Sequence, residues 1–103
     1  MKTDDLKGKG QDQPVLGIGW YKESQWNLLL EHAVDREDLE QTYGEWLEGI
    51  LEGIENFSKA GIHCEKIPID VAEMITWCKD NGYPFDGPSR SVFIARKTRH
   101  IYG

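Results

Sequence analysis

The sequence has few of the residues that identify a chemistry on sight. Its 103 residues include two cysteines and no CxxC pair, so four zinc ligands cannot be assembled at the spacing of a zinc finger. No apolar run approaches the roughly 18 residues that a membrane span needs. The opening stretch, MKTDDLKGKGQDQ, lacks the apolar core of a secretory signal. We therefore expect no membrane partner and a cytoplasmic location.

Basic residues are also in deficit. The chain has 12 Lys and Arg against 18 Asp and Glu, a formal net charge of −6. Nucleic acid is therefore not expected as a partner, because non-specific binding to phosphates depends on a surplus of positive charge. The two signs are separated along the chain: residues 31–55 hold nine acids and one base, whereas residues 87–103 hold four bases and no acid. Such separation favours contact with a protein surface of opposite sign.

Sequence signals for catalysis are equally sparse. Gly17 and Gly19 form a GxG, but the third glycine of a dinucleotide-binding loop and the lysine of a phosphate-binding loop are absent. Cys64 and Cys78 fall on apolar faces, where a free thiol packs as a small hydrophobe and lacks the base that a nucleophile needs. Four glutamates of the acidic segment, at three- and four-residue intervals, favour a solvated ridge over a metal site. We predict a non-catalytic protein with no metal and no cofactor.

Hydrophobic periodicity predicts one α+β domain at residues 14–103, which follows a polar arm at residues 1–13 that we expect to be disordered. Apolar runs bounded by turn residues predict strands, and apolar residues at helical spacing predict helices. The longest predicted helix has three glycines inside it, each of which costs about 1 kcal/mol against alanine. The predicted strands are 14–21 and 62–69, and the predicted helices are 24–34, 38–60, 70–81 and a last one that begins at 86.

The element order is β-α-α-β-α-α, which gives a small two-stranded sheet packed by four helices, one of them long. Two helices between the strands would return the chain to its starting side, so we predict an antiparallel pair. In the second strand, Ile62 and Cys64 are at even-numbered positions and would face one side of the sheet. Ile67 and Ile69 are at odd-numbered positions and would face the other side. This switch predicts a bulge at Glu65–Lys66. A two-stranded sheet is marginal in water, so it needs helices on one face. A second copy of the chain at the edge of the sheet is a further possible support.

Several short motifs resemble a family of small uncharacterised bacterial proteins. These motifs are GWY at 19–21, QW at 25–26, TYGEWL at 42–47, the WC of MITWC, and DGPSR at 86–90. The resemblance covers about residues 17–100, and this chain departs from the family at Glu23, where proline is commoner, and at Gly44. The resemblance implies a fold and a cytoplasmic bacterial setting, and it implies no activity.

Two groups of residues are candidates for a ligand site. Trp20, Tyr21 and Trp46 bring aromatic surface together, either as parts of the core or as the wall of a cleft. Ser89 and Arg90 lie in DGPSR at the start of the last helix, where free N–H groups and the helix dipole suit a phosphate or a carboxylate. The alternative for Arg90 is an ion pair with an acid of a neighbouring helix.

These observations predict a non-catalytic interaction module that forms a homodimer. We expect an interface centred on apolar residues with Arg96 and Arg99 at its rim, because exposed ion pairs contribute little binding energy and mainly set orientation. Within one protomer, the basic last helix could instead lie along the acidic long helix. The alternative function is a small anionic-ligand-binding protein, or a minor enzyme, that uses an aromatic cleft with Arg90. A cleft lined by Trp20, Trp46 and Arg90 would favour this second function.

Overall fold

The computed structural model describes residues 15–102, which form two strands, four α-helices and one short 3-10 helix. The arm predicted at residues 1–13 lies outside the described residues. No helix in this part of the chain is both long enough and apolar enough to cross a membrane. In chain order the elements are β1 (Val15–Trp20), α2 (Glu23–His32), η1 (Arg36–Asp38), α3 (Tyr43–Lys59), β2 (His63–Pro68), α4 (Val71–Asp80) and α5 (Gly87–Tyr102).

The two strands are parallel, so the predicted antiparallel pair is wrong. β1 and β2 pair in register from Val15 with His63 to Trp20 with Pro68. Of the two α-helices between the strands, only α3 runs along the sheet, because α2 packs beyond its end, against α4. The 17 residues of α3 span about 26 Å, which carries the chain back along strands of six residues that are about 20 Å long. One return pass, not two, therefore starts β2 beside the start of β1.

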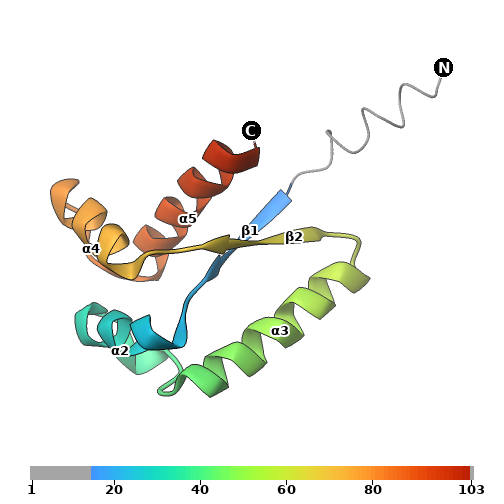
Figure 1. Ribbon diagram of the computed structural model, residues 1–103, viewed down its shortest axis with the longest axis horizontal. Coiled ribbons are helices and arrows are strands. Elements are labelled where there is room, and N and C mark those ends of the chain that lie inside the picture. The colour runs from blue at the N-terminus through green and yellow to red at the C-terminus, as the bar shows by residue number, and fades with distance from the viewer. Residues whose placement is uncertain (1–14, 103) are drawn as a thin grey trace.

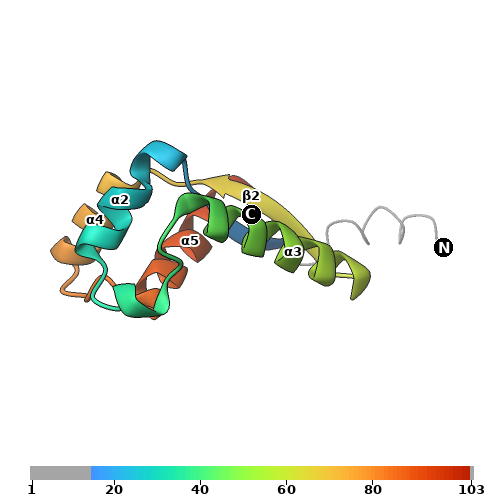
Figure 2. The same ribbon diagram turned by 90° about the horizontal axis from the view of Figure 1, so that it is seen from below.

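The sheet lies between α3 on one face and α5 on the other (Figure 1, Figure 2). α5 rests directly on a glycine of β1, since a Cβ at Gly17 would overlap the hydroxyl of Thr98. On the opposite face the ring of Trp20 packs against Trp46 of α3, with the ring centroids 5.4 Å apart and the ring planes tilted by 58°. Both faces of this small sheet are therefore covered by helices, as parallel sheets require.

The covered faces explain why β2 has no bulge at the predicted position. Its register with β1 runs without interruption through Glu65 and Lys66. Ile67 pairs with Gly19 and so shares the face that meets α5, whereas Cys64 lies on the face that meets α3. Each face of β2 packs against a helix, so apolar side chains on both faces are covered. The strand therefore needs no extra residue to bring them to one face.

α3 begins at Tyr43, five residues later than the helix predicted from residue 38. Thr42 is its N-cap, and the Thr42 hydroxyl accepts a hydrogen bond from the Glu45 N–H at 3.1 Å. The acids predicted in the first turn of this helix belong to η1 instead. At the other end, Gly61 takes a φ of +84°, the left-handed conformation that commonly follows a helix.

The core gathers where the carboxyl ends of the strands meet α2, α4 and α5 (Figure 1). Val71, Met74 and Cys78 form the inner face of α4, and each is at most 1% exposed. Leu29 of α2 and Ile67 of β2 are buried to the same degree. By contrast, Trp46, at 8% exposed, is the one buried residue of α3, so much of the apolar stripe of that helix stays partly open.

The open side of α3 gives the first testable expectation. No other element comes within 4 Å of the position that a Cβ on Gly53 would take. Gly53→Ala should therefore raise the free energy of unfolding by about 0.5–1 kcal/mol, because alanine loses less backbone entropy on folding. Gly61→Ala is the control that should lose stability, since its φ of +84° strains an alanine. Urea unfolding of both variants measures the effect, and a destabilised Gly53→Ala would contradict the open surface.

Candidate functional site

Five aromatic side chains pack together around Trp46. The centroid of the Trp46 ring lies 5.3–5.5 Å from the centroids of the other four rings. The Tyr43 hydroxyl donates to the carbonyl oxygen of Tyr21 at 2.9 Å, which ties α3 to the end of β1. Trp20 and Trp26, six positions apart in the sequence, thus meet on one ring. We call this group the aromatic cluster, and it consists of Trp20, Tyr21, Trp26, Tyr43 and Trp46.

A cleft of about 430 Å³ opens beside the aromatic cluster. Three of the five residues predicted to form a ligand site line it together: Tyr21, Trp46 and Arg90. Trp20 packs against Trp46 but does not line the cleft. Ser89 is buried in α5 and also lies outside the lining. The aromatic residues therefore serve as core packing and as the wall of a cleft at once.

Arg90 is ion-paired in this structure. Its guanidinium donates to both carboxylate oxygens of Asp35, at 3.0 and 2.8 Å, and to the carbonyl oxygen of Phe85 at 3.1 Å. The Arg90 side chain is 7% exposed and the Asp35 side chain 24% exposed, so the guanidinium is buried and the carboxylate is partly open to water. The hydrogen bonds from Arg90 lower the pKa of Asp35 below its usual value, and the carboxylate stays ionised. Arg90 therefore forms the predicted ion pair with an acid and does not present a free guanidinium to a ligand. The acid, Asp35, lies just before η1 and not within a neighbouring helix.

The first N–H groups of α5 are occupied as well. The N–H of Gly87 donates to the Asp35 carboxylate at 3.1 Å, and the N–H of Ser89 donates to the Asp86 carboxylate at 3.0 Å. The chain's own carboxylates therefore take the positions that a phosphate or carboxylate ligand would occupy at a helix start. An external anion would have to displace both of them.

Two of the residues that line the cleft, Trp26 and Tyr21, carry buried hydrogen-bond donors. The indole N–H of Trp26 is buried and has no hydrogen-bond partner among residues 15–102, and the residue is 3% exposed. Leaving such a donor unpaired costs about 1–3 kcal/mol. Burial raises the pKa of Tyr21 to about 12, against the opposing influence of the Arg90 charge. The Tyr21 hydroxyl therefore keeps its proton at physiological pH.

Neither cysteine has the surroundings of a nucleophile. Cys78 is 1% exposed, and burial raises the pKa of its thiol. Cys64 lies on the α3 side of β2, whereas His63 lies on the opposite side of the strand and pairs with Glu65. Among residues 15–102, no group of three or more His, Cys, Asp or Glu side chains is placed to hold a metal ion.

The two edges of the sheet differ in how they are protected against a further strand. The edge of β2 carries Pro68, which has no N–H to donate, and the charged residue Lys66. β1 has the sequence VLGIGW, which contains neither a charged residue nor a proline. Its Leu16 is 38% exposed. An apolar strand with an open edge is a template for pairing with another chain.

The unpaired backbone groups of β1 belong largely to its glycines. The carbonyl oxygen of Trp20 accepts from the N–H of Ile69 at 3.1 Å, so the backbone groups of Trp20 face β2. These groups alternate sides along a strand, so those of Ile18 also face β2. Gly17 and Gly19 therefore turn their N–H and C=O groups toward the free edge.

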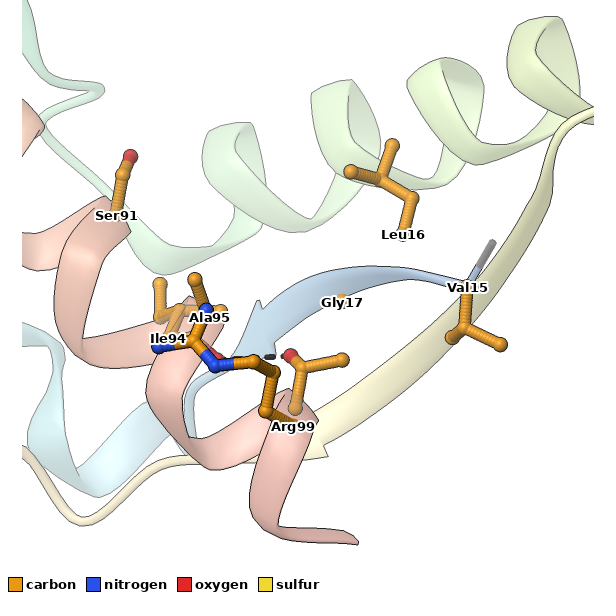
Figure 3. A pocket seen from close by; sticks show the side chains of 8 residues that line it. Val15, Leu16, Gly17, Ser91, Ile94, Ala95 and Arg99 are labelled. Carbon is orange, nitrogen blue, oxygen red and sulfur yellow. Dashed lines mark hydrogen bonds between the residues drawn. The ribbon is translucent and has the colours of Figure 1, made fainter. Parts of the chain in front are cut away.

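A second cavity, of about 360 Å³, runs along this free edge (Figure 3). Figure 3 shows Leu16 pointing toward α3, with α5 on the other side of the strand. The cavity shares Ser91 and Ile94 with the cleft beside the aromatic cluster, so the two adjoin. We call it the edge cavity, and its lining is Val15, Leu16 and Gly17 of β1 with Ser91, Ile94, Ala95, Thr98 and Arg99 of α5.

The segregated charges lie on opposite faces of the sheet. α3 carries the predicted ridge of exposed acids, and α5 carries the exposed bases Arg96 and Arg99. The arrangement in which α5 lies along α3 within one protomer is therefore wrong. Lys97 of α5 pairs with Glu73 of α4 at 3.0 Å, and no ion pair within residues 15–102 joins α3 to α5. The acidic ridge consists of Glu45, Glu48, Glu52 and Glu55.

The sequence did not predict three features of this region: the ion pair between Asp35 and Arg90, the contact of α5 with Gly17, and the N–H of Trp26 that has no partner among residues 15–102. Asp35 lies 55 positions from Arg90, and no local pattern joins the two. Glycines in a strand do signal a close approach by another segment, but they do not identify α5 as that segment. A tryptophan on a buried stripe does signal a donor in need of a partner, and that signal was present at Trp26.

Comparisons of the chain with protein-family models, with curated proteins and with solved structures found no match. The resemblance to a bacterial family therefore stays a prediction.

Proposed function

We propose that this protein is a non-catalytic interaction module that forms a homodimer through the free edge of β1. The contrast between the two edges carries the proposal: Pro68 and Lys66 block β2, whereas β1 is apolar and unblocked. Pairing there would satisfy the outward backbone groups of Gly17 and Gly19. It would also extend a two-stranded sheet, which is marginal on its own.

A second copy suits this edge because β1 is compatible with itself. Two identical strands can pair across a two-fold axis when they run antiparallel. Centred on Gly17, such a pair sets Val15 opposite Gly19 and Leu16 opposite Ile18 of the other copy, with no charged side chain in either strand. Leu16, which is 38% exposed in one copy, would then be covered.

The charges on the helices determine how such a dimer responds to salt. A two-fold axis normal to the sheet keeps each face, so the acidic ridge lies on the same side in both copies. Of the bases on the other side, Arg99 lines the edge cavity at the rim, whereas Arg96 lies over Trp77 of α4. Salt screens both repulsions, so dimerisation should tighten between about 0.05 and 0.5 M salt, as the Debye length falls from roughly 14 to 4 Å. Complementary contact between α3 and α5 would give the opposite trend.

Leu16→Lys should weaken dimerisation by about tenfold or more, because a charge on an edge strand opposes pairing. Leu16 is more than a third exposed in the protomer, so the fold should keep its stability. Val92→Lys is the matched control, since it places the same charge at a residue of α5 that is 47% exposed and lies outside both cavities.

Sedimentation equilibrium or light scattering at micromolar concentrations measures the dissociation constant of all three proteins. We expect a wild-type dimer, a Val92→Lys dimer of similar affinity, and a Leu16→Lys protein that is largely monomeric. A wild type that stays monomeric over the whole range, or a Leu16→Lys protein that dimerises equally well, would remove β1 as the interface.

The alternative function, a small anionic-ligand-binding protein or a minor enzyme, has the aromatic cleft in its favour. Tyr21, Trp46 and Arg90 line a concave site of about 430 Å³. An anion fits it poorly, because Asp35 already neutralises Arg90 and the carboxylate of Glu40 also lines the cleft. The cleft is thus better matched to a ligand of another class.

A further inference from the structure

A third cavity, of about 510 Å³, opens between α4 and α5. Its volume falls within the range of small-molecule sites, roughly 300–1,000 Å³. It shares no residue with the cleft beside the aromatic cluster and only Arg99 with the edge cavity. We call it the α4–α5 cavity. Its apolar wall is Trp77 of α4 and Phe93 of α5, whose ring centroids lie 5.5 Å apart.

The charged side chains that line the α4–α5 cavity leave a surplus of positive charge. Glu73 is the one carboxylate in the lining, and it pairs with Lys97 at 3.0 Å. Arg96 and Arg99 also line the cavity, and neither has an ion-pair partner among residues 15–102. Two positive charges are therefore left without a lining carboxylate to offset them. The cavity favours an anion and opposes a cation.

Aromatic rings support two of the basic groups. The guanidinium carbon of Arg96 lies 5.5 Å from the centroid of the Trp77 ring, and the ammonium of Lys97 lies 5.6 Å from the centroid of the Phe93 ring. A guanidinium that packs on a ring keeps N–H donors free at its edge, and these fit the oxygens of a phosphate or a carboxylate. Arg99 follows Arg96 by three positions on α5, so the two side chains are neighbours on the helix surface. Two adjacent guanidinium groups suit an anion of charge −2.

We propose that the α4–α5 cavity binds a small phosphate monoester that carries a flat apolar group. The phosphate lies between Arg96 and Arg99, whose two positive charges match its charge of about −1.5 to −2 at pH 7. The flat group packs against Trp77, which is only partly buried. Ligand binding here is additional to self-association and does not depend on it.

Three probes test the proposal: phenyl phosphate carries both groups, whereas inorganic phosphate and phenol carry one each. The indole N–H signals of the ¹⁵N-labelled full chain report where a probe binds. Phenyl phosphate should shift the Trp77 signal in a saturable way and leave those of Trp26 and Trp46, which line the other cleft. It should bind about tenfold more tightly than either of the other probes. An unchanged Trp77 signal, or a one-group probe that binds as tightly as phenyl phosphate, would overturn the proposal.

A variant identifies the phosphate-binding group. Arg96→Gln removes one of the two guanidinium groups and should weaken the binding of phenyl phosphate about tenfold. Arg96 is exposed and does not line the edge cavity, so folding and dimerisation should be kept. Arg36→Gln is the matched control, because it makes the same change at an exposed residue outside all three cavities. Equal affinity in the two variants would overturn the assigned site.

Two further measurements separate the proposal from its neighbours. A short peptide with a phosphotyrosine carries the same aryl phosphate on a protein chain. If it binds more than about tenfold more tightly than phenyl phosphate, a protein partner replaces the small molecule and the proposal is overturned. Leu16→Lys should bind phenyl phosphate as the wild type does, because Leu16 does not line the α4–α5 cavity. Failure of dimerisation and failure of ligand binding are thereby distinguishable.

Discussion

Asp35→Asn should lower the free energy of unfolding by about 3 kcal/mol and the melting temperature by more than about 10 °C. The amide leaves the guanidinium of Arg90, which is 6% exposed, without its countercharge. In the wild type, Arg90 donates to both carboxylate oxygens of Asp35, and one of these oxygens also accepts from the N–H of Gly87. The substitution replaces one of the two oxygens with an NH₂ group, which cannot accept. Thermal unfolding followed by circular dichroism measures the loss.

The same ion pair gives a pH dependence of defined sign. Because the bonds from Arg90 lower the pKa of Asp35 in the folded state, the pair stabilises the protein above the ordinary carboxyl pKa of 3.8. This contribution is lost as the pH falls through the lower, folded-state value, so wild type should lose more stability on acidification than Asp35→Asn. Asp38→Asn removes the same charge from an exposed residue and is the control. An Asp35→Asn protein that melts within about 2 °C of Asp38→Asn would contradict a structural role for the pair.

Gly17→Ala should be destabilising to a similar degree, by about 3 kcal/mol. The new Cβ would overlap the hydroxyl of Thr98 and lie 2.9 Å from the Thr98 Cβ. Thr98 is 8% exposed, and its hydroxyl already donates to the carbonyl oxygen of Ile94 at 2.8 Å, so it has little room to turn away. α5 would have to move off β1. Urea unfolding of the variant measures the cost.

Two further variants separate this overlap from a general effect of altering β1. Gly19→Ala should lose no more than about 1 kcal/mol, because its Cβ would chiefly meet the mobile end of the Ile94 side chain. Adding Thr98→Ala to Gly17→Ala should restore more than half of the loss, since the two positions are in contact. A Gly17→Ala protein as stable as wild type would show that α5 does not rest on this strand.

Local chemistry made the kinds of element predictable. Asp70 followed by Glu73 is a helix-start pattern, and the Asp70 carboxylate accepts from the Glu73 N–H at 3.2 Å in the structure. The apolar run that ends in GWY predicts a strand, and β1 covers six of its eight residues. From the sequence alone, the aromatic residues near Trp46 could form a core or the wall of a cleft. In the structure they pack together, and Tyr21 and Trp46, but not Trp20, also line a cleft.

Strand direction and the partners within the site depend on contacts between distant residues, which periodicity does not report. The pattern of residues 43–59 shows a helix but not that this helix alone spans the sheet, so the strands were predicted to run in opposite directions. The parity switch in β2 has two physical explanations, an extra residue or a helix on each face, and the sequence does not separate them. The pairing of Asp35 with Arg90 likewise follows from how the chain packs α5 against the loop after α2.

The proposed interface is tested most directly by hydrogen exchange of individual amides, measured by NMR at several protein concentrations. The N–H of Ile18 faces β2, so it should be protected at every concentration. The N–H groups of Gly17 and Gly19 face the free edge, so they should exchange quickly in dilute protein. Both should become protected, by about tenfold or more, over the concentrations at which light scattering shows a dimer. Fast exchange of both glycines in a dimeric sample would show that the dimer uses another surface, and it would contradict the proposed interface.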